Sequence, residues 1–205
     1  MKKLFYTVAN LFRTIPTLLV LLSLNKNARG IIRREFCYWA KLTRMPGQGL
    51  GAFSMLLSQF KEYRNLLHQR IRTVGGGKLR AGFVKLLYPG VKSLFIFTQN
   101  IGECLFIQHG YATTISADAI GDYCWINQQV TIGYDIDNPN RPRLGNGVRV
   151  CAGAKVIGDI SLGDNAIVGA NAVVVKDVAQ NAVVGGIPAR QISTNESHRL
   201  YPPAE

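Results

Sequence analysis

The amino-acid sequence predicts a mainly β protein, in which a parallel β-helix follows an α-helical N-terminal region. Two observations lead to this prediction. Aliphatic residues recur every six positions through the second half of the chain, which is the signature of a β-helix. Positive charge and aromatic side chains are concentrated in the first part instead. With 205 residues, 47% of them hydrophobic and 18% charged, the chain is neither disordered nor expected to exceed two domains.

The net charge of +12 is confined to the N-terminal part of the chain. Residues 1–78 contain 14 Lys and Arg but only two acidic residues, whereas the remainder contains ten of each sign. A basic balance ordinarily indicates an acidic partner such as a nucleic acid or an anionic membrane, and here that inference concerns the N-terminal part alone. A glycine-rich connector lies at residues 73–77. The composition thus predicts a basic, apolar helical region at 1–78, a β-helix at 79–192 and a polar tail at 193–205.

The N-terminal region should consist of amphipathic helices. The apolar run Ile15–Leu24 is too short to span a bilayer, and it contains Pro16 with no cleavage site after it, so a signal peptide is not expected. Residues 31–44 mix apolar and basic side chains at helical spacing. They fit either a packed helix with a solvated basic face or a helix that lies on a membrane surface. The Ser54–Arg72 segment repeats apolar residues every three or four positions, which predicts one helix carrying a structural His68.

Each six-residue repeat predicts one short strand and one tight corner, so that three repeats close a triangular coil. The aliphatic residue points inward and stacks on its equivalent in the next coil, and the glycine that often follows it accepts the corner geometry. About four coils, or a prism about 20 Å tall, fit between Ile101 and Val184. A β-sandwich would require period-two alternation, which the sequence does not show. The repeat positions, with Thr113 filling one place, are Ile101, Ile107, Ile120, Ile126, Ile132, Leu144, Val150, Val156, Leu162, Val168 and Val174.

Two irregularities interrupt the repeat. One extra residue is expected between Thr113 and Ile120, and Tyr134–Arg143 form a polar, proline-containing loop that cannot be a regular strand. Loops that leave a rigid solenoid are common binding sites. The four cysteines have no CxxC spacing, so we expect reduced thiols in a cytoplasmic protein and no metal site.

His109 is the strongest catalytic candidate in the repeat. It lies two residues after Ile107, so its side chain should project outward near a corner of the β-helix. An imidazole ordinarily titrates near neutral pH, which suits the removal of a proton from a hydroxyl. The sequence therefore predicts that His109 is a general base. Asp118, or a carboxylate from another subunit, is a candidate to orient it.

Five segments of the second half resemble the left-handed β-helix acyltransferases: CLFIQHGYATTI, WINQQVTIG, LGNGVRVCAGAKVIGDI, VGANAVVVKDV and VVGGIPARQI. The resemblance covers about residues 61–192 and is greatest to the serine acetyltransferases and their relatives in bacterial surface-polysaccharide pathways. It implies a left-handed helix, an acetyl-CoA-dependent O-acetyltransferase without a metal, and a homotrimer whose active sites lie between subunits. It also places His109 at the position of the catalytic base.

The same resemblance assigns the ligand-binding positions. Those near the thioester and along the pantetheine arm of acetyl-CoA are Gly133, Tyr134, Ala152, Gly153 and Ala170. The cations expected at its phosphates are Lys176 and Arg190, and the residues expected to contact the acceptor are Gln108, Asn127, Gln128 and Arg141. Small side chains in the first set let a thin ligand approach the backbone.

The chain departs from the serine acetyltransferase pattern where that pattern binds serine and orients the base. Leu94 occupies the position of an Asp fifteen residues before the catalytic His, and Ile96 and Phe97 replace a His-Pro pair. Arg141 replaces a second His. These departures favour a sugar hydroxyl as the acceptor, in a bacterial surface polysaccharide or its lipid-linked precursor.

Two other functions remain open: serine O-acetyltransferase of cysteine biosynthesis, and a non-catalytic β-helix scaffold. A polysaccharide pathway would place the enzyme in the cytoplasm, with the basic N-terminal region in peripheral contact with the inner face of the cytoplasmic membrane. Nucleic-acid binding is not expected, because no aromatic and basic groove accompanies the charge.

Overall fold

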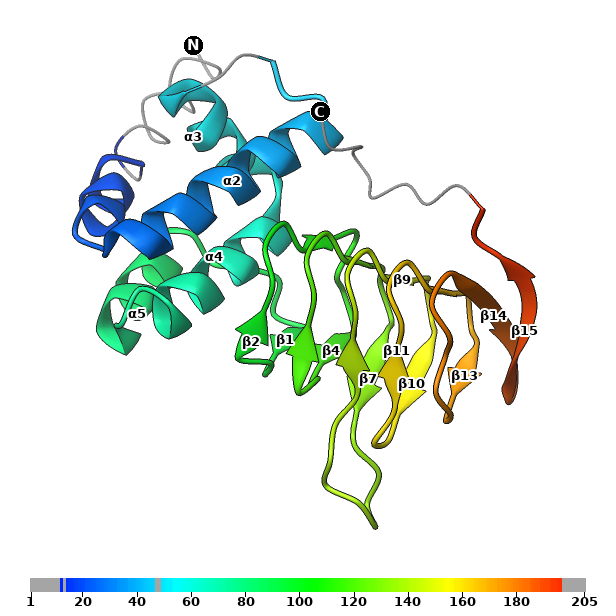
Figure 1. The fold of residues 1–205 in the computed structure, drawn as a ribbon. Helices are drawn as coiled ribbons and strands as arrows, with labels where there is room; N and C mark the ends of the chain where they lie inside the picture. The colour runs from blue at the N-terminus through cyan, green and yellow to red at the C-terminus, as the bar shows by residue number, and fades with distance from the viewer. Residues whose placement is uncertain (1–11, 13, 47–48, 197–205) are drawn as a thin grey trace. The chain divides into compact units, whose positions relative to one another are not determined.

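The computed structural model describes residues 12, 14–46 and 49–196, and the chain divides into two compact units, with the boundary in the sequence between Val91 and Lys92 (Figure 1). The first unit is helical and the second is a β-helix, which confirms the predicted fold class. In the part of the chain that the structure describes, no helix is both long enough and apolar enough to cross a bilayer.

The helical unit is built around aromatic side chains. A helix at residues 14–22 precedes its four longer helices, α2 (Lys26–Leu42), α3 (Leu50–Gln59), α4 (Lys61–Thr73) and α5 (Lys78–Leu87). The Asn25 side chain caps α2 by accepting a hydrogen bond from the Ala28 amide at 2.8 Å. Trp39 of α2 is fully buried and its ring lies 5.3 Å from that of Tyr63 on α4. These aromatic contacts hold α2 against α4.

The single helix predicted for Ser54–Arg72 is instead two helices that are broken at Phe60, whose backbone is extended (φ −110°, ψ 95°). The buried Arg64 guanidinium explains the break. It donates hydrogen bonds to the carbonyl oxygens of Leu57 and Ser58, in the last turn of α3. A cation at this end satisfies carbonyl groups that have no partner within the helix. The apolar spacing runs unchanged through both helices, so it does not reveal the break.

The helical unit extends further along the chain than the composition predicts, because α5 belongs to it. Tyr88, which follows α5, is buried, and its hydroxyl lies 2.9 Å from Thr14 Oγ1. The Asn65 side chain accepts a hydrogen bond from the Val91 amide at 2.7 Å and donates one to the Val91 carbonyl at 3.1 Å. Residues 79–91 are therefore fixed to the helices and do not begin the β-helix.

The β-helix has three sheets, one for each side of the triangular coil, and their strands pair in parallel except for β14 with β15 (Figure 1). Sheet A consists of β1 (Leu94–Ile96), β4 (Thr113–Ile115), β7 (Thr131–Gly133), β10 (Lys155–Ile157) and β13 (Val173–Val174). Sheet B consists of β2 (Asn100–Ile101), β5 (Ala119–Ile120), β8 (Arg143–Leu144) and β11 (Ser161–Leu162). Sheet C consists of β3 (Phe106–Ile107), β6 (Trp125–Ile126), β9 (Arg149–Val150), β12 (Ile167–Val168), β14 (Ala182–Gly186) and β15 (Ala189–Thr194).

The sheets define five coils, where the sequence predicts about four. The additional coil starts at Leu94, before the first aliphatic residue of the regular repeat. At the other end, β15 turns back and pairs antiparallel with β14, and it includes the first two residues of the predicted polar tail. Because β15 covers the outer edge of β14, it protects the last strand from pairing with another chain.

The strand register corrects the predicted repeat at one place. Ile115 pairs with Ile132, so Ile115 occupies the aliphatic position, and Thr113 pairs with Leu94 instead. Both side chains are fully buried, so the sequence pattern does not show which of the two occupies the repeat position. Eight residues, rather than six, thus separate Ile107 from Ile115. The extra length lies in the corner that carries His109, and not between Thr113 and Ile120.

The recurrent glycines are required by close approach between coils. A Cβ atom on Gly121 would lie 2.7 Å from the side chain of Asn146 in the next coil, and one on Gly145 would lie 2.4 Å from Asp164 Oδ1. Asn146 Oδ1 accepts a hydrogen bond from the Asp122 amide at 2.8 Å, and Asp164 Oδ1 accepts one from the Asn146 amide at 2.7 Å. Neither glycine has a positive φ, so the predicted role in corner dihedrals does not apply to them.

Candidate active site

His109 lies in the enlarged corner between β3 and β4. Its backbone has a positive φ of 53°, and its carbonyl accepts a hydrogen bond from the Tyr111 amide at 2.7 Å. Its side chain is exposed, as the predicted outward projection requires. The corner is braced against the next coil, because the Gln129 amide donates to the Tyr111 carbonyl at 3.0 Å. The imidazole is therefore accessible and stands on a rigid backbone.

Most of the predicted ligand-binding residues lie along one edge of the prism, where sheet C leads into sheet A. Equivalent corners follow β3, β6, β9 and β12, so they stack from coil to coil. Backbone hydrogen bonds connect them: the Gly153 amide donates to the Gln128 carbonyl at 3.0 Å, and the Asn171 amide donates to Ala152 at 2.9 Å. The residues on this edge, which we call the His109 edge, are Gln108, His109, Asn127, Gln128, Ala152, Gly153 and Ala170.

Small and amide side chains make up this edge beyond His109. Asn127 Nδ2 donates to Gln108 Oε1 at 3.0 Å, which links the first two coils beside the imidazole. Gly153 has a φ of 75°, and a Cβ atom there would lie only 1.9 Å from Asn171 Oδ1. Ala170 is exposed and presents a single methyl group. An extended ligand could therefore lie close to the backbone along these corners.

Gly133 and Tyr134 lie on the opposite edge of sheet A. They are at the end of β7, about 10 Å along the strand direction from the corner where that strand begins. Tyr134 is half exposed, and the Arg141 guanidinium lies 5.8 Å from the centre of its ring. Within one chain, the structure thus separates Gly133, Tyr134 and Arg141 from His109 rather than bringing them together.

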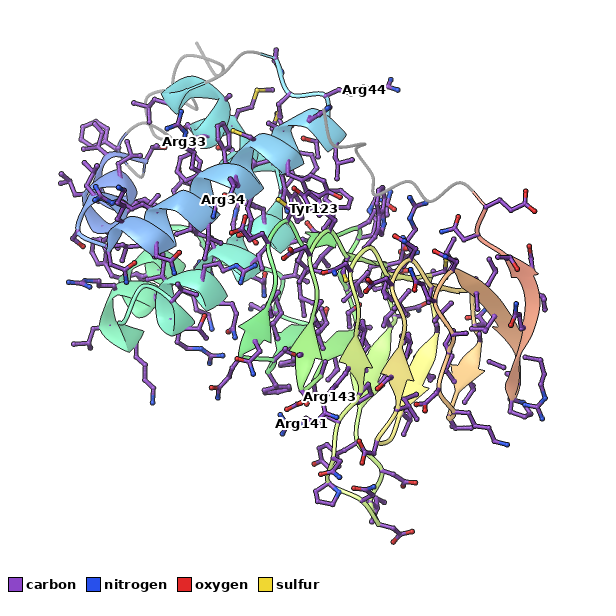
Figure 2. The ribbon with its side chains drawn as sticks, in the orientation of Figure 1. Arg33, Arg34, Arg44, Tyr123, Arg141 and Arg143 are labelled. Carbon is purple, nitrogen blue, oxygen red and sulfur yellow. The ribbon has the colours of Figure 1, made fainter. Side chains whose placement is uncertain are left out.

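The loop that starts at Tyr134 projects from the β-helix, as predicted, with Arg141 and Arg143 near its base (Figures 1 and 2). Asn140 Nδ2 donates to Asp159 Oδ2 at 2.9 Å and so ties the loop to the following coil. Arg143 Nε lies 2.8 Å from Asp118 Oδ2 in an exposed ion pair. Asp118 thus pairs with Arg143 in this chain, and its candidate role in orienting His109, like that of a carboxylate from another subunit, stays a prediction.

A cavity of about 320 Å³ lies at the C-terminal end of the β-helix, between the last coil and β15. Its lining includes both cations expected at the phosphates of acetyl-CoA, Lys176 and Arg190, together with Asp177 and Gln191. Arg190 is positioned by its pairing with Gly185 in the β14–β15 ladder. Four strand spacings, or about 20 Å, separate this end from the His109 corner.

Cys124 and Cys151 do not offer a second nucleophile. All four are free. Cys124 is fully buried, and this burial raises the pKa of its thiol to about 12. Burial also raises the pKa of Cys151 above its ordinary value, although Arg149 acts in the opposite direction. Both thiols are therefore protonated at neutral pH, and a thiol is a much weaker nucleophile than a thiolate. Within the described ranges, no cluster of His, Cys, Asp and Glu has the composition of a metal site.

Lys155 is a further residue beside the His109 edge that is not among the predicted site residues. Its ammonium group donates to the Gln129 carbonyl at 2.6 Å, so it lies beside the His109 edge on the outer face of sheet A. The signal was present in the segment CAGAK, where the lysine follows the small residues directly. The inward and outward alternation of a strand places it outside, next to the buried Val156.

Residues 141–176 match the family model "Bacterial transferase hexapeptide (six repeats)". The chain is 45% identical to a serine acetyltransferase of Synechococcus elongatus over 109 residues, which cover 52% of this chain and 41% of that protein. A serine acetyltransferase of Staphylococcus epidermidis is 32% identical over 165 residues, or 75% of this chain and 73% of the relative. The chain spans less than half the length of the Synechococcus protein.

Solved structures agree on the fold. A serine acetyltransferase from Brucella abortus superposes with a TM-score of 0.67 at 24% identity, over 87% of this chain and 74% of that one. A structure of the Brucella abortus enzyme in complex with coenzyme A gives a TM-score of 0.63 at 23% identity, over 87% and 72% of the two chains. At this level of identity, these structures support the left-handed β-helix architecture alone.

These comparisons correct the predicted acceptor. The departures at Leu94, Ile96, Phe97 and Arg141 favour a polysaccharide, but the relatives described above are all named as serine acetyltransferases. The expectation of polysaccharide O-acetylation is therefore wrong, and the alternative derived from the same resemblance is the one that they support. The repeat, the fold and the extent of the match to the Staphylococcus protein together show that this chain belongs to the serine acetyltransferase family of hexapeptide-repeat transferases.

Proposed function

We propose that the protein transfers an acetyl group from acetyl-CoA to the side-chain hydroxyl of serine. The observation that carries this proposal is the His109 edge, which joins an exposed imidazole to a line of small residues on one rigid surface. Serine is proposed as the acceptor because the relatives are named as serine acetyltransferases. The cavity that contains Lys176 and Arg190, at the C-terminal end of the same β-helix, supplies cations for a phosphorylated donor.

In the proposed reaction, neutral His109 accepts the proton of the serine hydroxyl as the oxygen attacks the thioester carbonyl of acetyl-CoA. A C–O bond forms and gives a tetrahedral intermediate. The C–S bond then breaks, and the departing CoA thiolate receives the proton from the imidazolium, so that charge and protons balance. General base catalysis of this kind contributes about 10²–10⁴-fold to the rate.

The donor would lie along the prism. The thioester would be near His109, the pantetheine arm would follow Ala152, Gly153 and Ala170, and the phosphates would meet Lys176 and Arg190. Because the exposed Ala170 has only a methyl group, an amide-containing chain can approach the carbonyl and amide groups of this edge closely. Four strand spacings give this path a rise of about 20 Å along the prism, and the path must also cross sheet A, because Lys176 follows β13 on the edge opposite the His109 edge.

The acceptor is expected to contact amide groups beside His109. Gln108 and Asn127 already form a hydrogen-bonded pair there. Gln128 Oε1 is buried and has no hydrogen-bond partner among the described residues, so the side chain would have to turn outward to accept from the ammonium group of an amino acid. The carboxylate of serine would need a cation, and Arg141 is the candidate.

Arg141, Gly133 and Tyr134 could meet His109 only if two chains share a site, because they lie on different edges of sheet A within one chain. We therefore propose a homotrimer in which the projecting loop of one protomer reaches the His109 edge of the next. This arrangement supports a site that is assembled between subunits.

The test is release of CoA thiol from acetyl-CoA in the presence of L-serine, with the wild-type chain, His109→Ala and His198→Ala compared. His109→Ala should lower kcat by about 10²–10⁴-fold, whereas His198→Ala should not change it. Equal activity of wild type and His109→Ala would refute the mechanism, and absence of turnover with serine would refute the acceptor. If calorimetry also showed no binding of acetyl-CoA, the chain would be a non-catalytic scaffold.

A further inference from the structure

We propose that the helical unit binds the surface of an anionic lipid membrane through a face that combines exposed apolar side chains with basic ones. This inference concerns where the protein works, and it does not depend on the proposed reaction. The face is formed by the helix at residues 14–22 and the adjacent N-terminal half of α2. We call it the N-terminal face.

The helix at residues 14–22 is apolar on its solvent side. Ile15, Leu19 and Leu22 are spaced by four and three residues and therefore lie on one side of the helix. They are 54%, 63% and 64% exposed. Phe12, one turn earlier, is 75% exposed. A surface helix of a water-soluble domain ordinarily places polar residues on this side.

The other side of this helix is already packed. Thr14 and Thr17 are fully buried, and Thr14 Oγ1 lies 2.9 Å from Ser54 Oγ and from the Tyr88 hydroxyl. The helix therefore cannot rotate to bury Leu19 and Leu22 without losing these contacts. Its exposed apolar stripe is a fixed feature of the helical unit.

Positive charge lies directly beside the stripe. A groove of about 300 Å³ is lined by Leu18 and Leu22 of this helix together with Arg29 and Arg33 of α2. Both arginines are exposed, and Arg33 is labelled in Figure 2. Apolar and cationic groups thus form one continuous surface.

Acidic residues are scarce in this part of the chain. The first 46 residues contain a single carboxylate, Glu35, and it is buried in an ion pair with Arg70. Across residues 1–91, 16 Lys and Arg oppose two acidic residues. This excess of positive charge favours a partner that carries many negative charges over a broad surface. A bilayer of anionic lipids offers phosphates to the arginines and an apolar layer to Leu19 and Leu22.

The experiment is flotation of the full-length protein with vesicles of phosphatidylcholine alone or mixed with phosphatidylglycerol. Binding should require the anionic lipid and should fall in about 1 M salt, where the Debye length shrinks to about 3 Å. Arg29→Gln with Arg33→Gln should weaken binding about 25-fold, which corresponds to about fivefold for each cation. Leu19→Ser with Leu22→Ser should weaken it by about tenfold or more.

Matched controls come from the same unit. Leu79→Ser with Leu86→Ser removes side chains that are 91% and 79% exposed on α5, and Lys61→Gln with Lys78→Gln removes two exposed cations. Neither pair should change vesicle binding. The inference is overturned if the wild-type protein does not float with anionic vesicles, or if the control pairs weaken binding as much as the test pairs. It is also overturned if Leu19→Ser and Leu22→Ser instead dissociate an oligomer during sedimentation without lipid, because the face would then bind a second copy of the chain.

Discussion

The Arg70 guanidinium of α4 donates to the Glu35 carboxylate of α2, with a Nε–Oε1 distance of 3.0 Å, and both side chains are almost completely buried. Two charges that are removed from water are stable only while they remain paired. The pair therefore fixes how α2 packs against α4 in the helical unit.

Removing one member of this pair should destabilise the helical unit strongly. Glu35→Gln or Arg70→Met should each cost about 3–5 kcal/mol, because the remaining charge or polar group stays buried without its partner. The double variant Glu35→Leu/Arg70→Met should recover much of this loss. Urea unfolding followed by tryptophan fluorescence measures the effect, since Trp39 is buried in this unit. Glu62→Gln is the control, and single and double variants of equal stability would contradict the prediction.

The stability of the helical unit should decrease as the pH falls below neutral. Burial, reinforced by the positive charge of Lys85, lowers the pKa of His68 to about 4. The unfolded chain therefore binds a proton between about pH 6.5 and pH 4 that the folded chain does not bind, and folding weakens through this window by about 2–3 kcal/mol. Urea midpoints between pH 4 and pH 7.5 should show this slope, and His68→Gln should reduce it. If the urea midpoint of His68→Gln depended on pH as steeply as that of the wild type, groups other than His68 would cause the pH dependence.

Adding a methyl group at Gly145 should disrupt the β-helix. The new Cβ atom would lie 2.4 Å from Asp164 Oδ1 and 2.9 Å from the Asp164 amide nitrogen, so the coils would have to separate. We expect Gly145→Ala to lower the unfolding free energy by about 2–3 kcal/mol, the usual cost of forcing extra atoms into a packed site. Gly82→Ala on α5, where a Cβ atom meets no other atom within 4 Å, should be neutral or stabilising. Thermal unfolding compares the two, and equal melting temperatures would contradict the close-contact explanation.

Loss of the cations in the C-terminal cavity should affect binding of the donor selectively. Lys176→Ala and Arg190→Ala should each raise KM for acetyl-CoA on the order of tenfold, because each loses an ionic hydrogen bond to phosphate. The values of kcat and of KM for serine should stay close to those of the wild type. Lys92→Ala, which removes an exposed lysine just before the first coil, serves as the control. A change in kcat without a change in KM for acetyl-CoA would show that the cavity does not bind the donor.

The sequence predicts the β-helix well because each repeat residue has one physical role. Ile132, Val156 and Val174 must be aliphatic to fill the interior, and they stack in register as the spacing predicts. The predicted repeat position is wrong at Thr113. Thr113 and Ile115, on either side of Thr114, are both buried there, and the aliphatic one is Ile115. The same enlarged corner carries His109, so one of the two irregularities of the repeat lies at the residue that matters most for the proposed reaction.

Tertiary contacts account for the other differences. The break at Phe60 depends on Arg64, whose hydrogen bonds to Leu57 and Ser58 cannot be inferred from apolar spacing. Arg143 pairs with Asp118 although the two residues lie 25 positions apart in the sequence, so the pattern of the repeat does not reveal this contact. The acceptor was mispredicted for a different reason: Leu94 and Arg141 show which family residues are missing, but they do not identify the substrate that the remaining site accepts.

The number of coils sets the distance between His109 and the C-terminal cavity. The strands in register keep the C-terminal cavity at a fixed distance from His109, and each coil contributes about 4.8 Å to that distance. Duplicating one whole coil, for example residues 157–174, would preserve every stacking contact but move Lys176 and Arg190 further from the base by that amount. A donor held by its phosphates would then present its thioester short of His109. If the donor binds as proposed, the number of coils selects for the length of the carrier as well as for its chemical groups.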